Sequence, residues 1–327
     1  MVAVFPGAAA HERGIALASV WVLAAAPMAG LKPSVRALAL LTSWKALALL
    51  AVPAVAFIAG HGTFAHFEPF LGRRAGAPPL LPALAGGLVG VFFSFGGFWE
   101  ASRLAGEIRL GHRALPRALA AGTVAVTLIY ILTTAAFLYL VPAERTRDGA
   151  AFARLAGEAL FGQAGPAILS GIVVLSAAAS ALALLLMAPR VYVAMSRDGL
   201  FSNALAATSA STGAPTRATA LLAAIASIYV LSGTFEQILP LFLGPALAFV
   251  ALAAAALFRI RRRDGAPEAF RCPGYPATPV LFIAFLLAVA VVVAAGHPLP
   301  VLAGFAIVAL GLPAHRLFSR RRRSPSA

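Results

Sequence analysis

The sequence predicts an all-α polytopic membrane protein with about nine transmembrane helices. Of its 327 residues, 61% are hydrophobic and 11% are charged, and the mean hydropathy is +0.90. Soluble domains are about 45–50% apolar and about 25% charged, so a water-soluble globular chain is excluded. A collagen or disulfide-rich scaffold is also excluded, because glycine and proline follow no period and Cys272 has no second cysteine to pair with.

Nine runs of apolar residues have lengths near that of a membrane-spanning helix. Such a helix needs about 20 apolar residues to cross about 30 Å of hydrocarbon. The predicted spans are 15–31, 37–59, 83–104, 118–141, 166–188, 218–231, 237–258, 278–295 and 299–315. The connections are too short to bury a core of their own. We therefore expect residues 1–327 to form a single transmembrane domain whose function lies inside the helix bundle.

The net charge of +15 comes mainly from short basic segments beside the apolar runs. In a soluble protein this charge would suggest nucleic-acid binding. Here, if the connections alternate sides, most basic residues fall on one side, which the positive-inside rule makes cytoplasmic. We expect a multi-pass protein of the cytoplasmic membrane with a cytoplasmic, basic C-terminal tail (316–327) and no nucleic-acid partner. Nine spans would then leave the N-terminus outside, which suggests that further helices precede this sequence.

The third span carries the first interruption of the apolar pattern. Gly96 and Gly97 stand among aromatic residues in the stretch GVFFSFGGFWE, residues 90–100. Paired glycines there favour an unwound turn, whose free backbone groups would face an anionic ligand group such as a carboxylate. In the other interpretation the helix is continuous, and Gly86, Gly90 and Gly97 allow close packing against a neighbour.

Glu100 follows this stretch and lies within i,i+3 reach of Arg103. Residues at this spacing are neighbours on a helix surface, so an ion pair can form. We expect the pair to lie at the membrane interface.

Lys45 is the second interruption, roughly 12 Å into the second span at 1.5 Å per residue. Desolvation disfavours the ammonium form of a buried lysine, so this group could exchange a proton. The other interpretation is that its long side chain extends back to the lipid headgroups.

Ser176 and Ser180, in the fifth span, are i,i+4 neighbours on one helix face. They could coordinate an ion or a polar substrate, or bond the carbonyl groups of their own helix. The sequence has no metal-ligand spacing, paired carboxylates, nucleophile elbow or Walker loop. We therefore expect no enzyme activity, no metal and no cofactor.

Four segments together resemble the signatures of one family. Phe92–Phe98 is an aromatic–small–aromatic–x–Gly stretch, and Glu107-Ile108-Arg109 is followed by Leu115-Pro116-Arg117-Ala118. The other two segments are 189–199 with Gly213-Ala214-Pro215, and Pro273-Gly274-Tyr275-Pro276. In this order they resemble amino acid permeases of the amino acid–polyamine–organocation (APC) superfamily. The resemblance implies that the nine spans correspond to helices four to twelve, so we expect this sequence to lack the first three helices of the family pattern.

The resemblance implies a partial five-plus-five inverted-repeat bundle, similar to the leucine transporter. Residues 15–59 would be the remnant of the first repeat, 83–258 the second repeat, and 278–315 two C-terminal helices. The implied function is secondary transport of amino acids or related amines by alternating access, with substrate held between unwound helix segments.

The resemblance also assigns roles by position. Ser94, Phe95, Gly96 and Gly97 would present backbone groups to the substrate, with Phe93 as an aromatic gate. Lys45 falls where many members keep a lysine in place of a coupling sodium ion, which makes a proton the candidate coupling ion. Ser176 and Ser180 would line the same region.

Three departures from the family pattern leave a rival hypothesis open. The chain contains no Gly-x-Gly-Ile-Phe-like first-helix motif, Gly111 stands where a proline is expected, and Trp99 stands where polar residues are common. The rival is a truncated permease fragment that does not transport, or a membrane protein that depends on a partner.

Overall fold

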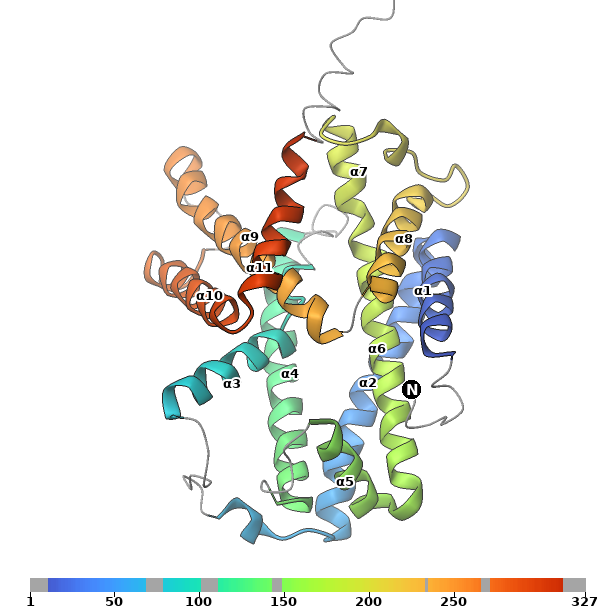
Figure 1. Ribbon diagram of the computed structural model, residues 1–327, viewed down its shortest axis with the longest axis vertical. Helices are drawn as coiled ribbons and strands as arrows, with labels where there is room; N and C mark the ends of the chain where they lie inside the picture. The colour runs from blue at the N-terminus through green and yellow to red at the C-terminus, as the bar shows by residue number, and fades with distance from the viewer. Residues whose placement is uncertain are drawn as a thin grey trace, which may run out of the picture. The chain divides into compact units, whose positions relative to one another are not determined.

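The computed structural model describes residues 11–68, 79–100, 111–142, 149–232, 235–265 and 271–313. All regular secondary structure in these ranges is helical, as predicted (Figure 1). Each predicted span corresponds to a helix: α1 (Glu12–Ala29), α2 (Leu31–Ala59), α3 (Leu80–Ser94), α4 (Gly111–Leu140), α6 (Gly165–Met187), α8 (Thr216–Ser232), α9 (Phe235–Asp264), α10 (Ala277–Gly296) and α11 (Pro298–Ala309). Two further helices, α5 (Gly149–Phe161) and α7 (Pro189–Arg197), lie in connections that the sequence leaves unassigned.

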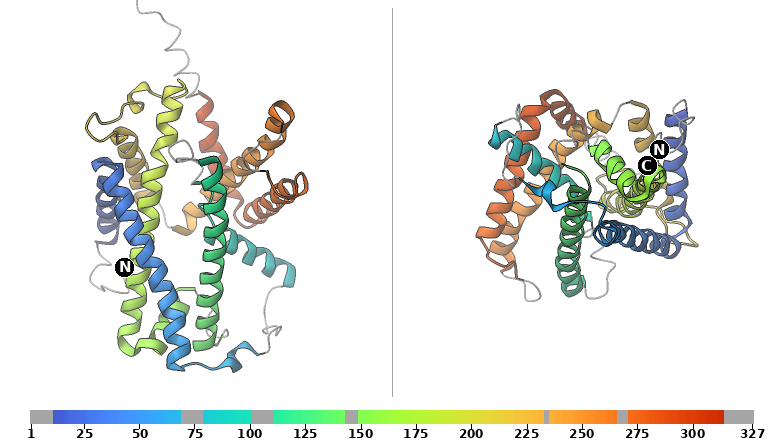
Figure 2. Two further views of the ribbon diagram at one scale, coloured as in Figure 1. Left: turned by 180° about the vertical axis from the view of Figure 1, so that it is seen from behind. Right: turned by 90° about the horizontal axis from the view of Figure 1, so that it is seen from below.

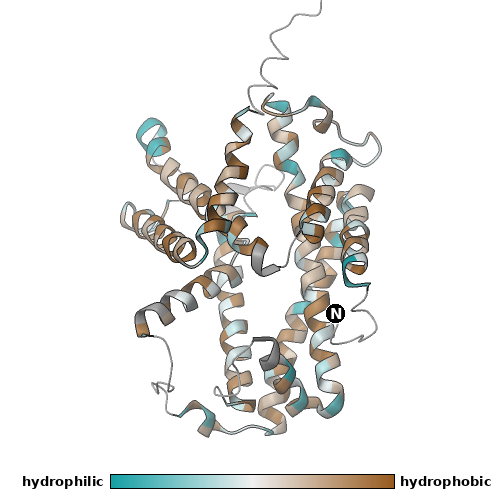
Figure 3. Ribbon diagram, in the orientation of Figure 1, coloured by the Kyte–Doolittle hydropathy of each residue, from teal (hydrophilic) through white to brown (hydrophobic). Residues whose placement is uncertain are grey.

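Five helical segments of the described chain are long and apolar enough to cross a membrane. They are Leu31–Ala59, Ala114–Leu140, Arg154–Arg197, Ile238–Asp264 and Ala277–Gly296. Thr216–Ser232 and Pro298–Pro313 are apolar but shorter. Hydrophobic residues dominate the ribbon (Figure 3), and many large apolar side chains are exposed, among them Leu40, Ile58 and Leu281. Apolar side chains on the outside of long apolar helices are typical of a multi-pass membrane protein.

Some expectations fall on residues that the structure does not describe. They concern Arg103, Glu107–Arg109 and the basic tail 316–327. The third span differs from its prediction, because α3 begins at Leu80 and ends at Ser94, ten residues before the predicted end.

The chain divides into two compact units, and each is described by itself. The first contains Met1–Ala77, Leu119–Leu186 and Thr208–Ala223. Its larger core joins α2, α4, α5 and α6 through buried residues such as Ala56, Ala136, Leu160 and Leu169. A smaller core joins α1 to α6 and α8 through Ala24, Leu185 and Ala223.

The second unit contains Pro78–Ala118, Met187–Ala207 and Ala224–Ala327. Here α9 packs against α10 and α11, and α3 packs against α10, as the orange, red and cyan ribbons of Figure 2 show. The core of this group includes Phe92, Leu247, Leu286 and Val293. Gly304 of α11 lies so close to the carbonyl of Leu241 that an added Cβ would overlap it. Small residues therefore allow close helix approach in this unit.

Leu286 and its neighbour Leu287 provide a matched test of the packing around α10. Leu286 is 0% exposed and Leu287 is 52% exposed. We expect Leu286→Ala to destabilise the protein by about 2–5 kcal/mol, because it leaves a cavity. Leu287→Ala should change stability by about 0.5 kcal/mol or less. Melting temperatures in detergent check this, and equal shifts for the two variants would contradict the burial of Leu286.

Candidate functional site

The third helix breaks at its paired glycines. After α3 ends at Ser94, the Phe95 N–H donates to Val91 O at 3.0 Å and the Gly96 N–H donates to Phe93 O at 3.0 Å. Gly97 then has a φ of +101°, which residues with a Cβ rarely adopt. The break that the sequence predicts here is therefore present.

The glycines of this helix have different roles. A Cβ on Gly96 would lie 2.9 Å from the carbonyl oxygen of Phe93, so the turn also excludes a side chain there. A Cβ on Gly86 or Gly90 would meet nothing within 4 Å. The alternative interpretation, in which Gly86 and Gly90 serve close helix packing, is therefore not supported.

Aromatic side chains anchor the broken segment to α10. The ring of Phe92, which is 6% exposed, lies 6.1 Å from those of both Trp99 and Phe285. The Phe98 ring lies 4.8 Å from that of Trp99 and 6.1 Å from that of Phe282. Trp99, where the family commonly has polar residues, is thus part of the packing that holds the turn.

The predicted binding residues of this stretch face different surroundings. Phe93 is 42% exposed, so it is available as a gate. The Ser94 hydroxyl donates to Gly90 O at 2.9 Å, so its side chain bonds its own helix. Glu100 is 8% exposed. Its predicted partner Arg103 lies outside the described residues, so the interfacial ion pair stays a prediction.

In the first unit, α2, α4 and α6 surround a cavity of about 240 Å³. Most of its lining is apolar, and its polar side chains are Thr42, Lys45, Tyr130 and Ser180. A mostly apolar cavity with a few polar groups is the common form of a small-ligand site. The apolar lining comes from Leu38, Ala46, Leu49, Val126, Ile129, Ala179 and Ala183.

Lys45 reaches across this cavity to α6. Its Nζ donates to Ser180 Oγ at 3.5 Å, and the Ser180 hydroxyl donates to the carbonyl of Ser176 at 3.2 Å. The serine proton points to its own helix, so its lone pairs are left for the ammonium group. Ser180 therefore bonds its own helix, which is one of the two roles expected for it, and its role in binding an ion or substrate stays a prediction. Lys45 contacts α6 through this hydroxyl.

The predicted site residues fall into two sets. Lys45, Ser176 and Ser180 belong to the first unit, where Lys45 and Ser180 line the cavity and Ser176 contributes only the carbonyl that accepts the Ser180 hydroxyl. Residues 93–97 belong to the second unit. Thr42 and Tyr130 also line the cavity, although the sequence analysis does not select them. The sequence feature that could have identified both residues is a hydroxyl side chain within an apolar span. No cluster of metal-ligating side chains occurs in the part of the chain that the structure describes.

Gly97→Ala tests the backbone conformation of the break. Alanine at a positive φ costs about 1–2 kcal/mol, so the melting temperature should fall. Gly90→Ala, in the helical part of α3, should leave it unchanged or raise it, because alanine favours a helix by about 1 kcal/mol. A Gly97→Ala variant as stable as Gly90→Ala would contradict the turn.

Comparison with known proteins shows which family this chain belongs to. Residues 2–312 match the sequence profile of a family described as amino acid permease. The chain is 27% identical over 270 residues to the branched-chain amino acid permease BcaP of Bacillus subtilis (strain 168), covering 79% of this chain and 54% of that protein. It is 29% identical over 201 residues to the serine/threonine exchanger SteT of the same organism, covering 60% and 46%. It is 28% identical over 186 residues to the vacuolar cationic amino acid transporter 4 of Arabidopsis thaliana, covering 56% and 31%. The chain spans about half the length of the two bacterial relatives.

Proposed function

Because the chain belongs to the amino acid permease family of the APC superfamily, we propose that it is a secondary transporter of amino acids or related amines in the cytoplasmic membrane. The family match over residues 2–312 is the observation that carries this proposal. The family is one of transporters and not of enzymes. The three relatives described above are named for branched-chain amino acids, for serine and threonine, and for cationic amino acids.

In this proposal the broken end of α3 forms part of the substrate site. A helix C-terminus leaves carbonyl groups without partners inside the helix and carries partial negative charge. Residues Ser94–Gly97 would present backbone groups of this helix end to the substrate amine and carboxylate, and Phe93 would close over the substrate. The exposed position of Phe93 and the fixed turn at Gly97 support these roles.

Lys45 is the proposed coupling group, with a proton as the coupling ion. Its partner Ser180 is a neutral hydroxyl, and none of the described residues that line the cavity carries a carboxylate. The ammonium group can therefore lose its proton without breaking an ion pair. Alternating access would use 83–258 as one repeat and 15–59 as the remnant of the other, with 278–315 as two additional helices and a cytoplasmic C-terminus.

Uptake by the full chain, reconstituted in liposomes, tests transport. We expect radiolabelled leucine, serine or arginine, one for each class of relative, to accumulate above the level of protein-free liposomes. The transport proposal would be wrong if no amino acid or amine entered. That result would favour the rival function, a permease fragment that does not transport by itself or that needs a partner.

Lys45→Ala tests proton coupling against Lys32→Ala. Both lysines lie on α2, but Lys32 is exposed at its start and does not line the cavity. We expect uptake by the wild type and by Lys32→Ala to vary over about pH 5 to 8, whereas uptake by Lys45→Ala should not. Lys45→Arg should also abolish the variation, because arginine keeps its proton throughout this range. An unchanged pH profile in Lys45→Ala would remove this role.

A further inference from the structure

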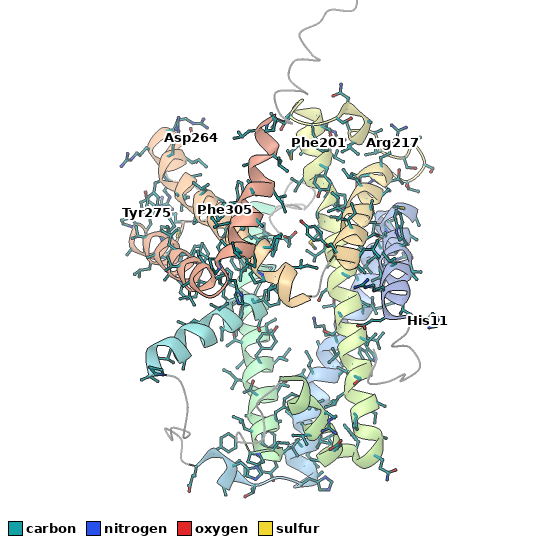
Figure 4. All side chains as sticks on the ribbon, viewed as in Figure 1. His11, Phe201, Arg217, Asp264, Tyr275 and Phe305 are labelled. Atoms are coloured by element: carbon teal, nitrogen blue, oxygen red, sulfur yellow. The ribbon has the colours of Figure 1, made fainter. Side chains whose placement is uncertain are left out.

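The junction between α9 and α10 concentrates positive charge where two apolar segments end. The span Ile238–Asp264 finishes in a basic run, and the next span begins at Ala277. The hydrophilic end of α9 is visible in Figure 3, and Asp264 and Tyr275 are labelled at the same end of α9 and α10 in Figure 4. Side chains between two membrane-crossing helices lie at the depth of the lipid headgroups. The arginines here are Arg259, Arg261, Arg262, Arg263 and Arg271.

In the described part of this junction the one carboxylate, that of Asp264, is already paired with an arginine. Arg263 holds Asp264 through two hydrogen bonds, from Nε to Oδ1 at 2.7 Å and from Nη2 to Oδ2 at 2.9 Å. Arg259, Arg262 and Arg271 are exposed and have no ion-pair partner among the described residues. Their charge therefore lacks an internal counter-ion in that part of the chain.

Arg261 is held in a fixed orientation within this cluster. Its Cζ lies 3.9 Å from the centroid of the Tyr275 ring, and that ring lies 5.7 Å from the ring of Phe258. Its Nε is buried and has no hydrogen-bond acceptor among the described residues. The buried Nε is not accessible from outside, but a guanidinium group that packs over an aromatic ring keeps its full charge, and its planar donors match the geometry of phosphate.

We propose that this basic junction, formed by Arg259, Arg261, Arg262, Arg271 and Tyr275, binds the phosphate group of an anionic phospholipid. The exposed side chains beside it are apolar: Ile260, between two of the arginines, is 52% exposed, and Leu281 of α10 is 69% exposed. The surface thus offers cations at headgroup depth and apolar contacts beside them, which suits an anionic amphiphile better than a free phosphate ion. This inference goes beyond the proposed transport function.

Native mass spectrometry of the purified full chain tests the proposal by measuring lipid affinity. The protein is titrated with phosphatidylglycerol, with phosphatidylcholine and with inorganic phosphate. We expect phosphatidylglycerol to bind more tightly than phosphatidylcholine, and inorganic phosphate not to compete at equal concentration. Each arginine near an anionic headgroup contributes about fivefold in affinity, so Arg261→Gln with Arg262→Gln should weaken phosphatidylglycerol binding about 25-fold.

Two further variants make the result decisive. Arg36→Gln removes an exposed arginine of α2 in the other unit and should leave phosphatidylglycerol affinity unchanged. Arg259→Gln with Arg271→Gln removes exposed charges without disturbing the Arg261–Tyr275 stack, and should weaken binding even if the first double variant fails to fold. The proposal is overturned by equal affinity for the two lipids, by full competition from inorganic phosphate, or by unchanged affinity in the variants. None of these results depends on whether the chain transports amino acids.

Discussion

Inside a bilayer no water is available for a peptide group that leaves a helix, so each N–H and C=O must find a partner in the protein or face a cavity. In the proposed transporter this constraint applies to the end of α3. The bond from the Phe95 N–H to Val91 O closes the last helical turn of α3, and the Glu100 N–H donates to Gly97 O at 2.9 Å within the turn that follows. The rings of Phe92, Phe98 and Trp99 fix this turn against α10. The break is therefore a built feature of the fold and not a frayed helix end.

The same constraint explains the surroundings of Lys45. The partly buried ammonium group of Lys45 has an acceptor, which is a hydroxyl that itself bonds its own helix. A carboxylate in this place would hold the charge in an ion pair. A hydroxyl holds it weakly, which is compatible with a group that gains and loses a proton.

Much of the fold could be predicted from hydrophobicity and length. The eighth predicted span, 278–295, differs from α10 by one residue at each end. In the third span the hydrophobic run 83–104 gives no helix end, whereas α3 ends at Ser94; only the paired glycines Gly96 and Gly97 indicate that the backbone conformation changes there. The short helices α5 and α7 were not predicted, since neither is a long apolar run.

The cavity could be predicted only in part. Lys45 is conspicuous as a charge within a span, but Thr42 and Tyr130 are not, because a threonine hydroxyl in an apolar helix usually bonds its own backbone and a tyrosine carries no charge that stands out. Thr123 and Thr127 bond their own backbone in α4, donating to Leu119 O and Thr123 O. The packing of α2, α4 and α6 decides which hydroxyl groups border the cavity. A single sequence does not specify this packing.

The single cysteine of the chain gives the α9–α10 junction a practical use. Cys272 is half-buried, directly follows Arg271, and its carbonyl accepts the Tyr275 N–H at 3.4 Å. A maleimide fluorophore or a nitroxide spin label would thus attach at one place only, without any engineered thiol. Its spectrum would report the polarity and motion of the lipid–water boundary beside these arginines.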